Sequence, residues 1–140
     1  MWWVYALLSS VTAALVAIFG KVGLQGVDST LATALRSIIM AVFMVLAALA
    51  LGKFSGFTFA NLAGRTWLFI ALAGIAGALS WLFYFLALKV GLVNKVVVID
   101  RLSLVFVVIL SALFLGEAFT WKVALGAVLM VGGALIIALA

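Results

Sequence analysis

Asp100 is the only carboxylate that lies within a long apolar run of this sequence. On a helix that begins at Val96, it lies about 6 Å along the axis, at 1.5 Å per residue. Because a charge among apolar side chains is costly, an ionisable residue in such a place is a functional candidate. Asp100 can bind a proton or a cationic group of a substrate. Ser103, three residues further on, lies on the same helix face and adds a hydroxyl.

The alternative interpretation of Asp100 is a structural ion pair. Arg36 lies at a similar distance from the start of another apolar run, and both runs would enter the membrane from the same side. A buried charge needs a partner whatever its role. Arg101 follows Asp100 directly, but adjacent helix residues point about 100° apart, so these two do not share a face. Arg101 can extend to the membrane surface or present its charge to an anionic group.

A second group of candidates forms one face of a helix over residues 67–88. The face contains Gly74, Gly77, Trp81, Tyr84 and Leu88. Glycines permit close approach of another helix, and Trp81 and Tyr84 would then line a groove that holds cationic or apolar ligands. Ordinary helix packing explains the same pattern and stays an alternative.

The first apolar run offers Tyr5, Ser9 and Thr12 on one face. Ala6, Ser10 and Ala14 follow small-residue spacing that favours helix contact. We therefore expect packing rather than chemistry here, with Tyr5, Ser9 and Thr12 kept as substrate candidates. The run contains no acid, which excludes an exporter that couples protons through a glutamate in its first span.

The elements that must position these residues are membrane helices. Of the 140 residues, 71% are hydrophobic and 8% are charged, against about 45–50% and about 25% in soluble domains. Each apolar run is close to the roughly 20 residues that a spanning helix needs. The sequence predicts a single all-α integral membrane domain over residues 1–140, with spans at about 2–20, 31–51, 67–88, 96–115 and 121–140. The segment Asp28-Ser29-Thr30 is expected to cap the start of the second span with its side-chain oxygens, and Thr66 and Thr120 are the expected caps of the third and fifth spans.

Composition excludes several classes of chemistry. The chain has no His and no Cys, so zinc, haem and iron–sulfur sites lack their usual ligands, and Ser-His-Asp and Cys-His nucleophile systems are impossible in cis. With three acids in all, we expect no metal, no cofactor and no enzyme activity. The net charge of +5 comes from basic residues scattered at span ends, which indicates membrane anchoring rather than nucleic-acid binding. The N-terminus lacks a basic region, so no cleavable signal is expected.

The basic residues do not orient the chain clearly. The N-terminal side of the membrane would carry Lys53, Arg65 and Lys122. The opposite side would carry Lys21, Lys89 and Lys95, with Arg36 and Arg101 just inside the spans. The positive-inside rule needs an asymmetry, which is weak or absent here. Either the opposite side is cytoplasmic by a small margin, or the chain inserts both ways and allows an antiparallel homodimer.

Three segments together resemble a known family. They are NKVVVIDRLS at residues 94–103 followed by Leu115-Gly116-Glu117, YFLAL at 84–88 leading to Gly91, and GVDSTLATALR at 26–36. Together they resemble the EamA domain of the drug/metabolite transporter superfamily over essentially the whole chain. The family often has a proline shortly before the Asp-Arg-Leu-Ser run, where this chain has Val98. With no proline in the chain, we expect no local helix break there.

The resemblance implies one five-helix half of an inverted-repeat transporter fold. It is typical of short bacterial or archaeal members, multi-pass proteins of the cytoplasmic (inner) membrane that work as dimers. It implies a secondary transporter that exports a small metabolite, amino acid or drug-like solute by alternating access. Two protomers, in an antiparallel homodimer, would enclose a midplane cavity lined by Ser9, Trp81, Tyr84, Asp100 and Ser103. The alternatives are a non-transporting membrane subunit, in which Asp100–Arg36 is a structural lock, and a lipid-carrier flippase component.

Overall fold

The computed structural model describes residues 1–58 and 63–140, and the regular structure in these ranges is helical. Five helical segments are long and apolar enough to cross a membrane: Trp2–Gly23, Ser29–Ala50, Gly64–Val90, Val93–Leu115 and Trp121–Leu139. The prediction of an all-α membrane protein with five spans is therefore confirmed.

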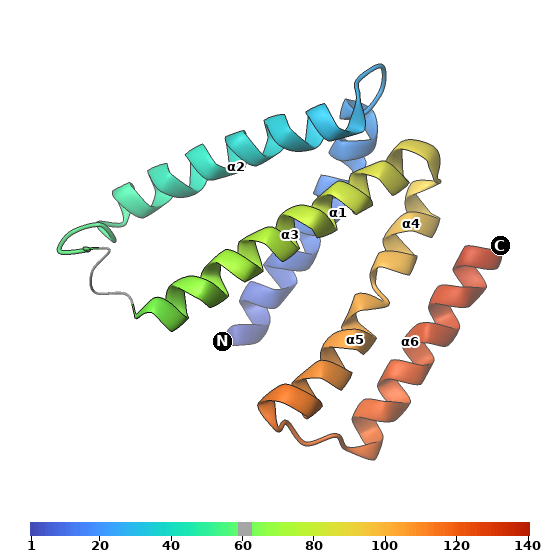
Figure 1. Ribbon diagram of the computed structural model, residues 1–140. Coiled ribbons are helices and arrows are strands. Elements are labelled where there is room, and N and C mark those ends of the chain that lie inside the picture. Colours follow the sequence, from blue (N-terminus) through green and yellow to red (C-terminus); the bar gives the residue numbers. More distant parts are fainter. Residues whose placement is uncertain (59–62) are drawn as a thin grey trace. The chain divides into compact units, whose positions relative to one another are not determined.

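Four of these spans are single helices and one is divided. The helices α1 (Trp2–Gly23), α2 (Ser29–Ala50), α3 (Gly64–Val90) and α6 (Trp121–Leu139) are continuous. The fourth span consists of α4 (Val93–Asp100), α5 (Ser103–Leu110) and the π-helical turn η2 (Ser111–Leu115) (Figure 1).

The ends of the helices follow local capping chemistry. Asp28 Oδ1 accepts hydrogen bonds from the backbone N–H groups of Thr30 (2.9 Å) and Leu31 (3.0 Å), and Thr120 Oγ1 accepts one from Val123 (3.4 Å). Both predicted caps are confirmed, because a side-chain oxygen satisfies amides that have no partner within the helix. The prediction for Thr66 is wrong, since α3 already begins at Gly64.

The chain divides into two compact units. Residues 22–89 form one unit, in which α2 and α3 run in opposite directions and are joined by the segment that follows Ala50 (Figure 1). Residues 1–21 and 90–140 form the other, in which α4 and α5 pack against α6. Within this second unit, Lys21 Nζ donates a 2.9 Å hydrogen bond to the carbonyl oxygen of Gly91, which ties the end of α1 to the turn before α4.

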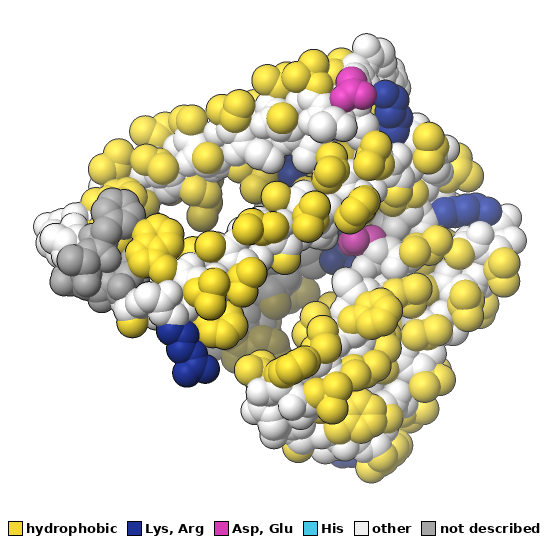
Figure 2. All heavy atoms as spheres, viewed as in Figure 1, with side chains coloured by type: hydrophobic (Ala, Val, Ile, Leu, Met, Phe, Trp, Pro, Cys, Tyr) yellow, Lys and Arg dark blue, Asp and Glu magenta, His cyan; other side chains and the backbone are white. Residues whose placement is uncertain are grey.

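The helices present apolar side chains outward. Ile39, Phe43 and Ile136 are 69%, 67% and 72% exposed, and Figure 2 shows hydrophobic side chains over most of the visible face, with few charged groups between them. Water would penalise such surfaces heavily, whereas lipid chains cover them without cost. The bilayer is therefore the solvent for these faces.

The fourth span is broken although the chain contains no proline. At the break, Leu102 donates to Ile99 (3.0 Å) and Leu104 donates to Arg101 (3.1 Å), so the backbone bonds run from residue i to i−3. Arg101 (φ −66°, ψ −12°) and Leu102 (φ −61°, ψ −20°) have the dihedral angles of a 3₁₀ turn. Our expectation of no local break here is wrong, because tightening the hydrogen-bond pattern interrupts the α-helix without a missing N–H group.

Candidate functional site

The strongest polar feature in the unit of residues 22–89 is a cation stacked on an aromatic ring. The guanidinium carbon of Arg36, on α2, lies 3.6 Å from the ring centroid of Trp81, on α3. It also lies 5.2 Å from the ring centroid of Phe85. The negative face of an aromatic ring attracts a cation within about 6 Å, most strongly for Trp. This contact couples α2 to α3 in the part that crosses the membrane.

Three aromatic rings form a cluster around this cation. The ring centroids of Trp81 and Tyr84 are 5.5 Å apart at an interplanar angle of 87°, and each lies 6.0 Å from that of Phe85. Such edge-to-face contacts are the preferred geometry for aromatic pairs. Phe85 is 3% exposed and Leu88 is fully buried. The predicted pair Trp81 and Tyr84 is thus brought together, on a packed aromatic support.

One side of α2 carries hydroxyl groups. Ser29 and Thr33 are buried, at 1% and 6% exposure. Thr33 Oγ1 donates to the carbonyl oxygen of Ser29, and Ser37 Oγ donates to that of Thr33, both at 2.8 Å. The hydroxyls of Thr33 and Ser37 thus donate to the backbone of their own helix, as Ser and Thr commonly do within helices. They therefore line this part of α2 with polar atoms without requiring partners on another helix.

Two buried polar atoms have no hydrogen-bond partner within the described part of the chain. They are Nη1 of Arg36 and Oγ of Ser29. Most buried polar groups in proteins are paired, so an unpaired one calls for an explanation. An arginine stays charged in proteins, so leaving its buried N–H group without an acceptor is more costly than leaving a hydroxyl unpaired.

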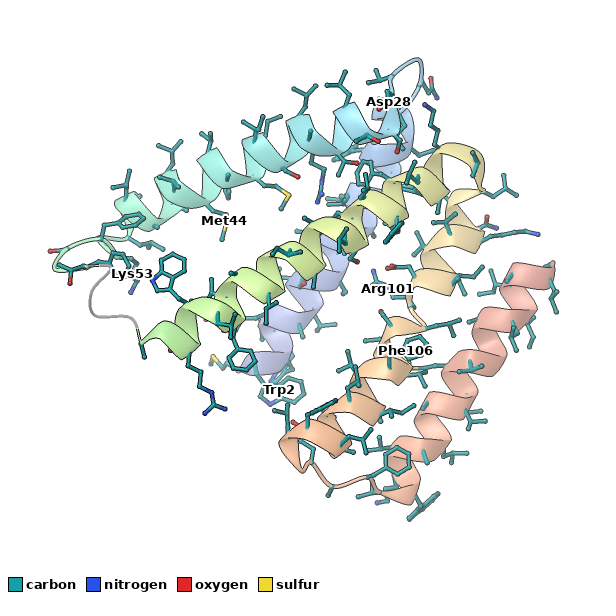
Figure 3. The ribbon with its side chains drawn as sticks, viewed as in Figure 1. Trp2, Asp28, Met44, Lys53, Arg101 and Phe106 are labelled. Atoms are coloured by element: carbon teal, nitrogen blue, oxygen red, sulfur yellow. The ribbon has the colours of Figure 1, made fainter. Side chains whose placement is uncertain are left out.

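The start of α2 and the end of α3 are connected by a lysine hydrogen bond, in addition to the helix cap at Asp28. Lys89 Nζ donates a 3.1 Å hydrogen bond to the carbonyl oxygen of Val27, next to Asp28, which is labelled at the start of α2 in Figure 3. The pKa of Asp28 is lowered, first by the N–H of Leu31 and then by that of Thr30 and the charge of Lys89. Asp28 and Lys89 therefore fasten the start of α2 to the end of α3.

In the other unit, Asp100 is the last residue of α4 and is half-buried. Arg101, at the junction of α4 and α5 (Figure 3), is exposed, and so is Ser103, the first residue of α5. Side chains three residues apart lie above one another in a 3₁₀ turn. Asp100 and Ser103 are thus expected to stay on one side of the span despite the break. Arg36 and Asp100 belong to different units, so their ion pair stays a prediction.

The candidate residues of the first span do not form a defined binding site. Tyr5, Ser9 and Thr12 are exposed on α1. Thr12 Oγ1 donates to the carbonyl oxygens of Leu8 and Ser9, both at 3.0 Å. Its hydroxyl proton is therefore shared within the helix, and a solute would meet an acceptor there rather than a free donor.

Sequence reasoning missed Phe85, Ser29 and Thr33. Phe85 follows Trp81 by four residues, which is helix-face spacing, so the 3.6-residue period contained a usable signal. Ser29 was treated only as part of the capping segment. The burial of these residues depends on tertiary contacts, which the sequence pattern does not specify.

A cavity of about 440 Å³ lies between α5 and α6. Its lining is apolar and includes Val105, Ile109, Phe119, Val128 and Leu135. Among the described residues, the side chains that line this cavity include no titratable group. Within the described residues, no group of three or more His, Cys, Asp or Glu side chains could hold a metal ion.

Comparison with known proteins agrees with this architecture. The sequence model of the EamA-like transporter family matches residues 1–139 of this chain. A protein of Sinorhizobium sp named "Uncharacterized transporter in cobO 3'region" is 42% identical over 137 residues, which cover 98% of this chain and 96% of that protein. No solved structure matches this chain significantly.

Proposed function

Because the chain belongs to the EamA-like transporter family, a family of membrane transporters and not of enzymes, we propose that it is a secondary transporter. It exports a small metabolite, amino acid or drug-like solute across the cytoplasmic membrane of a bacterium or archaeon. Two five-helix protomers form a homodimer, inserted in opposite orientations, and alternate access to a cavity near the midplane.

The observation that carries this proposal is the interruption of the fourth span beside Asp100. Substrate and ion sites of secondary transporters are typically built at discontinuous helices, where backbone groups and charged side chains face a cavity. Here the α-helix stops at Asp100 and resumes at Ser103. A carboxylate beside a backbone interruption inside a membrane span combines the two features of such a site.

Each candidate has a specific role in the proposed cycle. Asp100 takes up a proton or a cationic group, and Ser103 supplies a hydroxyl beside it. Trp81 and Tyr84 provide the aromatic wall, and Ser9 completes the polar lining from α1. The 3₁₀ turn at residues 101–102 allows the two halves of the span to move separately during rocking.

The test is flux of a panel of amino acids and drug-like cations in proteoliposomes, recorded as substrate-induced current. We expect Asp100→Asn to abolish the current while the yield of dimer stays unchanged. Glu117→Gln is the matched control, because Glu117 is an acid that lies outside the helices, between η2 and α6. It should retain the current. Full activity in Asp100→Asn would remove Asp100 from the mechanism.

The subunit alternative predicts a different result. There, Asp100→Asn loses fold or assembly, and adding Arg36→Gln restores part of it, because both members of a buried pair are then neutral. A stable homodimer with substrate-dependent flux argues against a non-transporting subunit.

A further inference from the structure

Arg36 is a charge inside a membrane span, and it has no counter-ion among the described residues of its own unit. It follows Ser29, the first residue of α2, by seven positions, about 10 Å along the axis. Nη1 is enclosed and has no acceptor among the described residues. The acid in the same unit, Asp28, already accepts from Thr30 and Leu31 at the helix start. A charge at this depth without an anionic partner is costly.

The stack on Trp81 determines which part of Arg36 remains for a ligand. A ring centroid 3.6 Å from the guanidinium carbon occupies one face of the planar group. The N–H groups lie in that plane and point outward at its edge, where an aromatic face cannot accept them. Held in this way, the guanidinium is a rigid fork that matches the two oxygens of a carboxylate. A second unpaired atom, Ser29 Oγ, lies two helical turns away on the same side of α2.

We infer that Arg36, held by Trp81, binds the carboxylate of a small anionic solute, so that the substrate provides the missing counter-ion. This inference rests on the proposed function and specifies its substrate class. One guanidinium balances one negative charge, which favours a carboxylate over a phosphate dianion. The aromatic cluster of Trp81, Tyr84 and Phe85 suits an apolar or aromatic body attached to that carboxylate.

The experiment compares acids with their amides on the purified full chain in an uncharged detergent. The probes are benzoate and benzamide, L-phenylalanine and L-phenylalaninamide, and 4-methylpentanoate and its amide. Binding is followed by tryptophan fluorescence and by thermal stabilisation. We expect at least one acid to bind about tenfold more tightly than its amide. Arg36→Gln should remove this preference, and Arg36→Lys should keep only part of it, because an ammonium lacks the fork.

The matched control is Arg65→Gln. Arg65 also faces a ring, with its guanidinium carbon 5.8 Å from the centroid of Phe69, but it lies in the first turn of α3. It should leave the acid preference unchanged. Unfolding curves of each variant separate loss of binding from loss of fold, and Arg36→Lys keeps the charge if Arg36→Gln does not fold.

Three outcomes would overturn the inference. The first is that Arg36→Gln still binds acids more tightly than amides, and the second is that no acid binds more tightly than its amide to the unaltered chain. The third is that acids bind only to Asp100→Asn, which would mean that Asp100 is already the ion-pair partner of Arg36. The same acids and amides are added to the panel of the flux assay, which keeps the two proposals apart. Flux of cations or neutral solutes alone contradicts this inference and leaves transport intact, whereas acid binding without any flux contradicts transport.

Discussion

The guanidinium of Arg36 rests on the indole ring of Trp81, with 3.6 Å between its central carbon and the ring centroid. This contact joins α2 to α3 within their membrane-crossing parts. It places a permanent charge against an aromatic cluster, where water is scarce and a cation–π contact is strongest. The contact is both a structural clamp and the support of the proposed ligand site, and the two roles make different predictions.

As a clamp, the pair should show energetic coupling. In a double-mutant cycle of Arg36→Met and Trp81→Leu, we expect a coupling free energy of about 1–2 kcal/mol, the range for desolvated cation–π pairs. The measurement is reversible unfolding in mixed micelles. The wider pair Arg65 and Phe69, at 5.8 Å, is the control and should couple by less than about 1 kcal/mol. Additive effects at Arg36 and Trp81 would show that the stack contributes nothing to stability.

The carboxylate of Asp28 should make stability depend on pH in acid. Its pKa is lowered by the N–H groups of Leu31 and Thr30 and by Lys89. A lowered pKa stabilises the fold at pH values above the ordinary pKa, and this contribution is lost as the pH falls through the folded pKa, so the window lies below about pH 4.

The check is the melting temperature from neutral pH down to acid for the unaltered chain and Asp28→Asn. Asn keeps an oxygen acceptor for the cap but does not titrate, so the gap between the two curves should close in acid. Asp28→Ala, which loses the acceptor, should melt lower at neutral pH. A gap that does not change with pH would show that the carboxylate charge does not matter.

Gly116 ends the fourth span in a left-handed conformation, with φ +68°. A Cβ there would meet no atom within 4 Å, so the cost of Gly116→Ala is the backbone alone, about 1 kcal/mol. Gly126 in α6 has equally open surroundings but no positive φ. Gly126→Ala should therefore stabilise, by up to about 1 kcal/mol. Unfolding free energies of both variants check this. A costly Gly126→Ala would instead reveal a second copy packed on that face of α6.

Insertion in both orientations should be visible by labelling. The sequence has no cysteine, so a single Cys appended after Ala140 reports one side of the membrane. With a membrane-impermeant maleimide on spheroplasts, we expect about half of the molecules to react, because the positive charges are nearly balanced. All should react after permeabilisation. Labelling of none or all of the molecules in intact spheroplasts would mean one fixed orientation and would exclude the antiparallel homodimer.

The caps show how far local sequence reaches. Asp28 and Thr120 were predicted correctly because a cap needs only a side-chain oxygen and the amides two or three residues further on. Thr66 was wrong, since hydropathy detects the part of a helix inside lipid, and α3 continues beyond it through polar residues to Gly64. The break at Arg101 and Leu102 was missed for a related reason. No residue there prevents an α-helix, so the residue types do not reveal that the backbone hydrogen bonds change from i−4 to i−3.

The sequence by itself determined that this chain is a five-span membrane protein and which few residues carry charge inside the spans. Hydropathy and capping are properties of residues that are close in sequence. The bilayer requires each spanning helix to be long and apolar enough, whatever the other helices do. Only the tertiary structure decided that Arg36 lies on Trp81 and Phe85, with one nitrogen enclosed and without a partner in the described part of the chain. That arrangement depends on how α2 and α3 are placed relative to each other, which no periodicity within either helix encodes.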